Sequence, residues 1–229
     1  MAGVAGRPVR CPISASPRST GRRGYAPGRR SRPARSGGWD VAIEVRAAGP
    51  AERTAVDALH EREWGGPYVI AHDTRYDLRT LPTLAAVDGA GAVVGALAHR
   101  VDAEGLEVVS VVAAVSGGGV GTALLSAATA TAAAAGLTRV WLITSNDNLR
   151  ALRFYQRRGM RLVRVDRGAV DRARLLKPEI PVVGEDGIPL HDEVVLELLT
   201  GVQGQPAGRS AAPWISLTTD DGPGRGGPR

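Results

Sequence analysis

The sequence predicts an α/β domain built on a mixed, mostly antiparallel central sheet flanked by helices. Between residues 83 and 115, three short apolar runs are separated by Asp/Gly turns, a pattern typical of an antiparallel meander. A glycine-rich loop, an Ala-rich helical segment and further apolar runs that alternate with helical patterns follow this meander. Together these patterns occupy residues 40–200, a length that suits one domain with a substantial core.

Alternation and glycine–proline pairs mark the first strand and helix. Residues 41–46 alternate apolar and other side chains, which predicts a strand. Gly49-Pro50 ends it, and Pro50 suits the first position of a helix that runs to about Trp64, before Gly65-Gly66-Pro67. Residues 68–82 show no clean period and are interpreted as a loop with one short helix.

The whole domain has the predicted order βα–βββ–αβ–αβ–β. Gly136 and Gly159 are suitable residues to end its two later helices. Residues 166–193 form a long connection before the last strand, and long ordered connections are frequently functional. The remaining predicted strands lie at 83–87, 93–101, 107–115, 139–144, 160–165 and 194–198, and the remaining predicted helices lie at 121–135 and 148–158.

Charge and glycine–proline content divide the chain into three parts. Residues 1–39 hold nine Arg and no acidic residue, and residues 201–229 have a net charge of +1. About a third of each end segment is Gly or Pro, so we expect a disordered arm and a disordered tail. Residues 40–200 carry 17 basic and 21 acidic residues, a net charge of −4. The overall charge of +6 therefore describes the arm rather than the domain.

Composition removes several functional classes. No apolar stretch approaches the ~20 residues of a membrane span, and no apolar segment follows the paired arginines of the arm, as a secretion signal requires. The single cysteine, Cys11, excludes an intrachain disulfide and a thiolate zinc site. The four histidines, at positions 60, 72, 99 and 191, lack metal-ligand spacing. We therefore expect a cytoplasmic protein that uses no metal.

Gly117–Gly121 lie between a predicted strand and a predicted helix, where backbone N–H groups and the helix dipole can hold a phosphate. A P-loop requires Lys and Ser/Thr after its last glycine, but Thr122-Ala123 follow here. The dinucleotide-binding fingerprint requires a glycine where Leu124 stands. Two interpretations remain: the pyrophosphate loop of a coenzyme A acyltransferase, or a flexible turn before a helix.

Two longer motifs resemble those of the GNAT acyltransferase superfamily. Residues 107–125 are similar to its central motif, a strand followed by Gln/Arg-x-x-Gly-x-Gly/Ala and a helix; the loop here is Ser116-x-x-Gly119-x-Gly121, and Ser116 departs from the usual Gln/Arg. Residues 148–160 resemble the motif Asn-x-x-Ala-x-x-x-Tyr-x-x-x-Gly-Phe, with Met160 in place of Phe. The resemblance covers about residues 41–200, and stretches within it resemble a bacterial subgroup whose acceptor is not established.

The resemblance implies the GNAT fold, with a sheet splayed at the acyl-CoA site. It implies direct transfer of an acetyl group from acetyl-CoA to a primary amine of a small molecule, peptide or protein. In this family the N–H groups of the glycine loop hold the pyrophosphate, and backbone of the preceding strand lines the pantetheine. The residues thus expected to bind acetyl-CoA are Val112, Ala113, Ala114, Gly117, Gly118, Gly119, Val120, Gly121, Thr122, Asn148, Ala151 and Tyr155.

The same resemblance implies two catalytic residues. Tyr155 matches the family tyrosine that protonates the departing thiolate, and a phenol is protonated at neutral pH; its alternative role is a core residue beside Phe154. Glu107 stands where many relatives place the carboxylate that deprotonates the amine, directly or through water; its alternative role is an exposed residue at a strand end. Asn148 is a pantetheine contact, a helix N-cap or both.

We expect two segments, 68–82 and 166–193, to select the acceptor. The candidate lining residues of the first segment are His72, Arg75, Tyr76 and Asp77. In the second segment, Arg174 and Lys177 either bind an anionic acceptor or pair with Glu179 and Glu185.

Two other functions remain compatible with the sequence. One is a catalytically silent acyl-CoA-binding regulatory module, although intact Tyr155 and Asn148 disfavour it. The other is a nucleic-acid-associated protein that uses the Arg-rich arm. Because 28 of the 29 basic residues are Arg, a compositional bias accounts for the arm equally well. A homodimer is also compatible with the resemblance, since dimers are common in the superfamily.

Overall fold

A computed structural model describes residues 42–116 and 118–200 of the chain. The predicted arm (1–39), the predicted tail (201–229) and Gly117 lie outside these residues. The strands are β1 (Glu44–Ala47), β2 (Tyr68–Ala71), β3 (Thr74–Asp77), β4 (Thr83–Val87), β5 (Val93–Asp102), β6 (Gly105–Ala113), β7 (Arg139–Ser145), β8 (Arg161–Asp166) and β9 (Glu193–Leu199). The helices are α1 (Pro50–Trp64), α2 (Val120–Ala134), α3 (Leu149–Gln156) and α4 (Ala169–Leu176), with short 3₁₀ turns η1 (Leu78–Thr80) and η2 (Glu185–Gly187).

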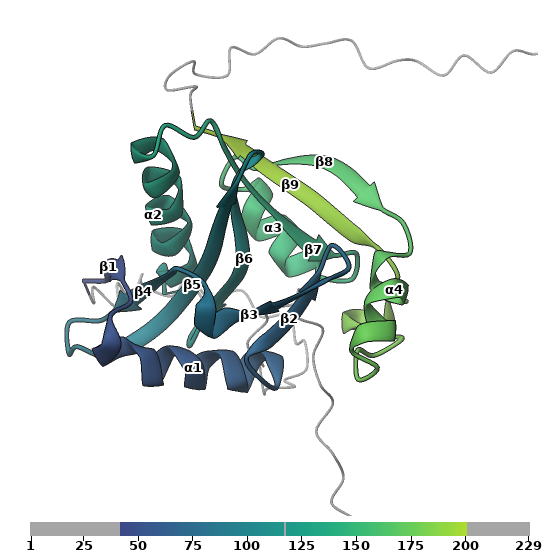
Figure 1. Cartoon of the computed structure of the whole chain (residues 1–229), viewed down its shortest axis with the longest axis horizontal. Coiled ribbons are helices and arrows are strands. Elements are labelled where there is room, and N and C mark those ends of the chain that lie inside the picture. Colours follow the sequence, from purple (N-terminus) through teal and green to yellow (C-terminus); the bar gives the residue numbers. More distant parts are fainter. Residues whose placement is uncertain (1–41, 117, 201–229) are drawn as a thin grey trace, which may run out of the picture.

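Seven strands form one sheet in the order β1-β4-β5-β6-β7-β9-β8, and β2 and β3 form a separate hairpin. Every neighbouring pair in the large sheet is antiparallel except β6 and β7, which are parallel. Helices flank this sheet (Figure 1). The predicted fold class, a mixed and mostly antiparallel sheet between helices, is therefore confirmed.

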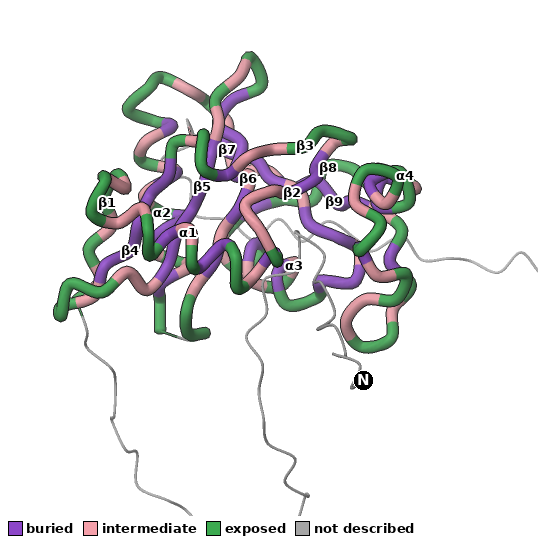
Figure 2. Tube along the Cα trace, turned by 60° about the horizontal axis from the view of Figure 1, so that its bottom comes forward, coloured by how far each residue is buried: buried purple, intermediate pink, exposed green. Residues whose placement is uncertain are grey.

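Two apolar clusters form the core, one on each face of the sheet. Helix α2 packs on one face through Leu124, Leu125 and Ala128, together with Tyr155 of α3. The other face is covered by α1 and the β2–β3 hairpin, whose buried side chains meet those of β4 to β6. Burial is accordingly concentrated along the central strands (Figure 2). The helices that follow the glycine loop and the segment predicted to select the acceptor thus lie on opposite faces.

The sheet opens at a β-bulge in β6. Strand β6 pairs with β7 only from Leu106 to Val108, but it remains paired with β5 as far as Ala113. The register with β5 shifts after Val108, so that Val109 has no partner residue. A bulge bends its strand and can terminate pairing. Here the bulge lies directly after the last residue of β6 that pairs with β7. The two strands separate from there on, as the splayed sheet implied by the resemblance requires.

The interpretation of residues 68–82 as a loop with one short helix is wrong for residues 68–77, whereas a short helix is present at Leu78–Thr80. Residues 68–80 form the β2–β3 hairpin and the turn η1, and the tip of the hairpin is His72-Asp73. Both tip residues have positive φ, 49° and 57°. Two-residue hairpin turns of this kind favour Asn-Gly or Asp-Gly, because those residues tolerate positive φ. The tip carries no such signal, and for this reason the sequence did not reveal the hairpin.

The connection 166–193 contains helix α4, which the sequence prediction missed. Its residues Val170 and Ala173 join Ile70 of β2, Ile180 and Leu190 in a small third cluster. This insertion therefore packs against the hairpin. The two segments predicted to select the acceptor are thus in contact with each other.

Three consecutive polar residues after β7 organise this region. Asn146 accepts hydrogen bonds from the N–H groups of His191 and Asp192 (both 3.0 Å). Asp147 accepts one from Glu185 N (2.9 Å) and another from Ser145 Oγ. Asn148 caps α3. Side chains from one short turn thus hold both the insertion and the helix that carries Tyr155.

Close packing of α2 on β5 requires a glycine at position 95. A Cβ at Gly95 would lie less than 3.0 Å from Val120 Cγ1 and from Val112 O. We expect Gly95→Ala to lower the free energy of unfolding by about 1–3 kcal/mol through overpacking. Gly118→Ala is the control, since a Cβ there meets nothing within 4 Å. Urea unfolding of both variants measures the difference, and equal stability of Gly95→Ala and wild type would contradict this packing.

Candidate active site

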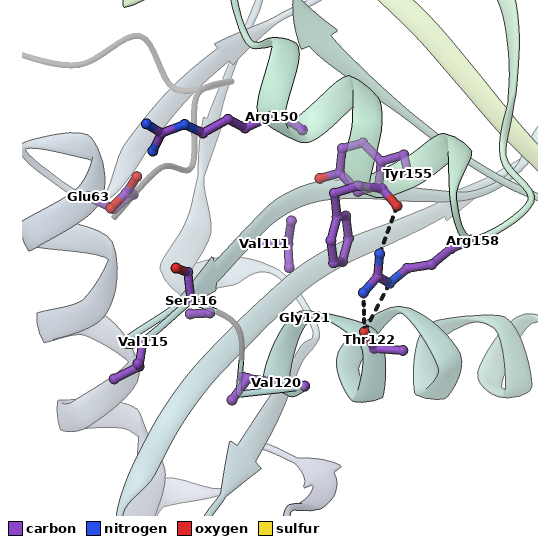
Figure 3. Close-up of a pocket in the computed structure, with 14 residues that line it drawn as sticks. Glu63, Val111, Val115, Ser116, Val120, Gly121, Thr122, Arg150, Tyr155 and Arg158 are labelled. Atoms are coloured by element: carbon purple, nitrogen blue, oxygen red, sulfur yellow. Dashed lines mark hydrogen bonds between the residues drawn. The ribbon is translucent and has the colours of Figure 1, made fainter. Parts of the chain in front are cut away.

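A pocket of about 410 Å³ lies where β6 and β7 separate (Figure 3). Helices α1 and α3 cover opposite faces of the sheet, and both contribute residues to the pocket wall. Its lining residues are Glu63 of α1, Val111, Ala113, Val115 and Ser116 of β6 and the loop that follows, Gly119, Val120, Gly121 and Thr122 at the start of α2, and Arg150, Ala151, Phe154, Tyr155 and Arg158 of α3 and the turn after it.

Strand β6 presents unpaired backbone to this pocket. Ala114 N donates to Val94 O (2.8 Å), so in the antiparallel ladder alternate residues bond to β5. Val111 and Ala113 therefore direct their N–H and C=O groups away from β5, toward the side on which β7 no longer pairs. The side chain of Val112 packs in the opposite core with α1. Of the predicted pantetheine contacts on this strand, Ala113 faces the pocket, as does Val111, which was not predicted.

The glycine loop leads into the N-terminus of α2 at the pocket wall. Gly119 is the N-cap with φ 79°, a left-handed conformation that favours glycine. A Cβ at Gly121 would lie 3.0 Å from the ring of Phe154, so this glycine allows α2 to approach α3 closely. The N–H groups in the first turn of α2, which includes Thr122, have no partner within the helix. The structure therefore offers backbone donors and a positive helix end here.

Arg158 adds a fixed positive charge at this end of α2, and the sequence analysis did not single it out. Its Nε donates to Thr122 Oγ1 (2.9 Å), its Nη1 donates to Phe154 O (2.9 Å), and its guanidinium lies 3.6 Å above the Phe154 ring. With 28 arginines in the chain, no single one carried a signal. Its position four residues after Phe154, in the turn that follows α3, did not distinguish it in the sequence.

Helix α3 places Tyr155 against the pocket. Asn148 Oδ1 accepts a hydrogen bond from Ala151 N (3.0 Å), so Asn148 is an N-cap. Tyr155 lines the pocket, although its side chain is largely buried and contacts the Phe154 ring edge-on at 5.1 Å. Burial raises the pKa of the phenol above its ordinary value, so it remains protonated at neutral pH. Tyr155 thus belongs to the core and to the pocket at once.

Glu107 lies on the hairpin face of the sheet, at the start of the splay. Its side chain is fully buried, which contradicts the alternative of an exposed residue at a strand end. One carboxylate oxygen accepts a hydrogen bond from His72 Nε2 (3.1 Å), and the other accepts one from Arg100 Nε. Of the four predicted acceptor residues, His72 is the one that meets this carboxylate.

The other three acceptor candidates have different surroundings. Arg75 is exposed and stacks on the ring of Tyr68 at 3.8 Å. Tyr76 is partly buried, with the guanidinium of Arg100 5.5 Å from the centre of its ring. Asp77 caps η1 and binds Arg79. The structure therefore brings Tyr76 near the Glu107 cluster and leaves Arg75 and Asp77 apart from it.

Glu193, at the start of β9, is a buried carboxylate that the sequence analysis missed. Its Oε2 lies 4.0 Å from His72 Nδ1. The His72 ring also packs against Trp141 of β7, with ring centres 5.1 Å apart. Burial raises the pKa of Glu193 to about 7. Burial alone would lower the pKa of His72, but the hydrogen bond and charge of Glu107 and the charge of Glu193 outweigh it and raise that pKa.

In the insertion, Arg174 and Lys177, for which the sequence left anion binding and pairing with Glu179 and Glu185 open, support the fold. Arg174 donates to the carbonyl oxygens of Pro181 (2.8 Å) and Leu190 and pairs with Asp171. Lys177 Nζ donates to the carbonyl oxygens of Trp64 (3.1 Å) and Tyr68 (3.4 Å). Both cations therefore join the insertion to itself or to α1 and the hairpin.

Comparison with known proteins identifies the family. The model of the acetyltransferase (GNAT) family matches residues 52–160, from α1 through the glycine loop to the end of the Tyr155 motif. Over 134 residues the chain is 37% identical to the uncharacterized protein YdhI of Bacillus subtilis (strain 168), across 58% of this chain and 84% of YdhI. The chain belongs to the GNAT acetyltransferase family.

Two solved acetyltransferase structures share the fold of this GNAT protein. The IAA acetyltransferase from Bacillus cereus ATCC 14579 matches 69% of this chain and 99% of its own, with a TM-score of 0.54 and 20% identity. An acetyltransferase from Bacillus subtilis in complex with CoA matches 70% of this chain and 99% of its own, with a TM-score of 0.51 and 20% identity. The GNAT fold expected from the motifs is thereby confirmed.

The described part of this GNAT chain contains no helix that is long and apolar enough to cross a membrane. Within residues 42–116 and 118–200, no group of three or more His, Cys, Asp and Glu side chains is arranged to hold a metal ion.

Glu193 makes stability depend on pH. Its pKa is about 7 when folded, above the ordinary value of 4.5, so folding favours the protonated form. Its contribution is fully present below pH 4.5 and is lost as the pH rises through 7. We therefore expect Glu193→Gln to gain up to about 3 kcal/mol of unfolding free energy relative to wild type between pH 4.5 and 8. Urea unfolding across this range, with Glu197→Gln as control, tests it; a pH-independent difference would contradict the raised pKa.

Proposed function

We propose that the protein is an N-acetyltransferase that moves the acetyl group of acetyl-CoA to a primary amine of a small molecule, peptide or protein. The observation that carries the proposal is one pocket in which three features converge: unpaired backbone of β6, the N-terminus of α2 beside Arg158, and the hydroxyl-bearing ring of Tyr155. The structure of a Bacillus subtilis acetyltransferase in complex with CoA, which has the same fold, supports acetyl-CoA as the donor.

The pocket has complementary groups for each part of this donor. The N–H groups from Gly118 to Thr122 and the charge of Arg158 suit the pyrophosphate. The amides of the pantetheine can pair with Val111 and Ala113, in the place that β7 would occupy in an unbroken sheet. Donors fixed in this way also stabilise the negative charge that develops on the thioester oxygen, commonly the largest catalytic contribution.

The transfer then requires one acid and one base. The acceptor nitrogen gives up a proton, its lone pair forms the bond to the acetyl carbon, and the C–S bond breaks with its electron pair on sulfur. Tyr155 is the proposed acid that protonates this thiolate, because it lines the pocket and remains protonated. The excess proton on the product nitrogen restores the phenol. Over the whole cycle, one proton leaves the acceptor ammonium and passes to solvent.

Glu107 is the residue predicted to act as the base. Its two carboxylate oxygens are already bonded to His72 and Arg100. We therefore assign it to a base assembly that includes His72 rather than to direct contact with the amine.

Turnover of acetyl-CoA against a panel of primary amines tests the proposal and the role of Tyr155. We expect Tyr155→Phe to lower kcat by about 10²- to 10⁴-fold, because the general acid is lost, while acetyl-CoA affinity stays close to that of wild type. Tyr68→Phe is the matched control, since its hydroxyl binds Arg79 on the hairpin surface. Thiol release and mass spectrometry of the products give the rates. Binding of acetyl-CoA without transfer to any amine would instead identify a silent acyl-CoA-binding module.

Arg158 provides a test of the donor site alone. We expect Arg158→Gln to weaken CoA binding by roughly 10-fold or more, as the loss of a charge-assisted contact to phosphate implies. Arg161→Gln, on the exposed edge strand β8, should bind CoA as wild type does. Calorimetric titration with CoA measures both affinities. Equal affinities would remove Arg158 from the pyrophosphate site.

A further inference from the structure

His72 is held in one position by contacts on both sides. Its backbone is in the left-handed region (φ 49°), which is unfavourable for residues other than glycine and persists only where the surroundings impose it. The next residue, Asp73, accepts from Arg172 Nε at 3.0 Å with both carboxylate oxygens, and Arg172 also binds Asp166 (3.0 Å). Helix α4 and strand β8 thus fix the tip of the hairpin, and with it the imidazole.

The two nitrogens of this imidazole have different environments. Nε2 is hydrogen-bonded to Glu107, whose other oxygen binds Arg100. Nδ1 faces Glu193 Oε2 at 4.0 Å, too far for a direct hydrogen bond. That oxygen has no hydrogen-bond partner, although the Glu193 side chain is 99% buried. A buried acceptor without a partner costs about 1–3 kcal/mol. Because no atom fits in line between two atoms 4.0 Å apart, a donor that satisfies both must lie beside them, about 2.9 Å from each.

The charges around this gap favour a cation. Glu107, Asp166 and Asp73 raise the pKa of one or the other member of the His72–Glu193 pair, whereas Arg164 lowers that of His72. Glu107 is bonded to Arg100, and Asp166 and Asp73 are bonded to Arg172, so the negative charge at the gap comes mainly from Glu193. The ring of Trp141 forms one wall next to His72, and Tyr76 lies beneath Arg100. Because the pKa values of Glu193 and His72 are both raised, an added cation would displace protons that these groups hold near neutral pH.

The cluster is joined to the proposed reaction centre through strand β6, although none of the cluster residues lines the pocket. Glu107 immediately precedes Val108, the last residue of β6 that pairs with β7, and Trp141 pairs with Glu107 across that ladder. A group bound beside His72 is therefore at the vertex of the splay, on the face opposite α3. The pocket that holds Tyr155 opens at the same splay.

We propose that the ammonium group of the acceptor binds in the gap beside His72 Nδ1 and Glu193 Oε2 and that His72 Nδ1 removes its proton. This inference rests on the proposed N-acetyltransferase function and refines its base assembly. One N–H bond of the ammonium breaks, the proton joins Nδ1, and the nitrogen lone pair so released attacks the acetyl carbon. The imidazolium then returns its proton to solvent through its exposed edge. Glu107 is a positioning residue that holds Nε2, and Glu193 binds the cation.

Binding to the gap can be measured without turnover. Imidazole ¹⁵N NMR of the full chain with CoA, titrated with n-butylammonium, reports directly on His72. We expect n-butylammonium to shift the His72 resonances and lower the pKa of this residue, because it brings a positive charge close, and we expect 1-butanol to have no effect. Glu193→Gln should weaken the response by roughly 10-fold or more. Glu197→Gln, on the same strand and face but paired with Arg139, should keep it.

Steady-state kinetics with any amine that is acetylated in the panel separate the role of His72 in proton removal from the role of Glu193 in cation binding. We expect His72→Gln to lower kcat by about 10²- to 10⁴-fold, with partial rescue of His72→Ala by added imidazole. Glu193→Gln should raise KM for the amine and move the acidic limb of kcat/KM to lower pH, since His72 loses a neighbouring anion. His191→Gln is the control for the first variant, because His191 is exposed and binds Asp171. Thermal unfolding confirms that each variant is folded.

The outcomes for this inference and for the proposed function are distinct. If His72→Gln and Glu193→Gln keep wild-type kcat/KM while Tyr155→Phe loses activity, the inference is wrong and the acetyltransferase function stands. If no amine is acetylated although acetyl-CoA binds, the proposed function fails. The NMR titration alone then decides whether an ammonium group binds beside His72. His72 resonances that n-butylammonium leaves unchanged would then overturn the inference.

Discussion

The parallel pairing between β6 and β7 stops after three residues, and the pocket and the proposed chemistry both depend on this limit. Val109 is a bulged residue without a partner on β5, and the ladder to β7 ends beside it. Beyond it, the backbone of Val111 and Ala113 is free to bind a ligand instead of a strand. The buried hydrogen bond from Trp64 Nε1 to Ser110 Oγ (2.9 Å) fixes the strand immediately after the bulge to α1. This bond connects the start of the open edge of β6 to the helix on the hairpin face.

The bulge also separates two environments along one strand. Before it, Glu107 points to the hairpin face and joins a buried network of His72, Arg100 and Glu193. After it, Val111 and Ala113 point to the face that carries α2 and α3. One strand therefore contributes a charged side chain to one face of the sheet before the bulge, and unpaired backbone donors and acceptors along its β7 edge after it. Such a division suits a reaction that joins a thioester donor to a cationic acceptor.

Local patterns and two motifs were enough to predict the sheet, its order along the chain and the helices α1, α2 and α3. They also located Gly119, Gly121, Ala151 and Tyr155, which all line the pocket. The hairpin could not be predicted, because His72-Asp73 lacks the glycine that usually marks such a tip. Glu193 could not be predicted either: its importance comes from burial beside His72, a contact between residues far apart in the chain. Local sequence encodes strands and loops, whereas the burial of a carboxylate beside an imidazole arises only from tertiary packing.

The turn Asn146-Asp147-Asn148 limits which other segments could replace residues 166–193. Asn148 caps the helix of Tyr155, while Asn146 and Asp147 hold the insertion through backbone N–H groups of His191, Asp192 and Glu185. Gly184 is needed there, because a Cβ at this position would collide with the Asp147 carboxylate. A foreign insertion could replace residues 166–193 only if it supplied a glycine and free N–H groups at the same places. Replacement of this insertion is thus restricted by two adjacent side chains, those of Asn146 and Asp147, which directly precede the cap of the Tyr155 helix.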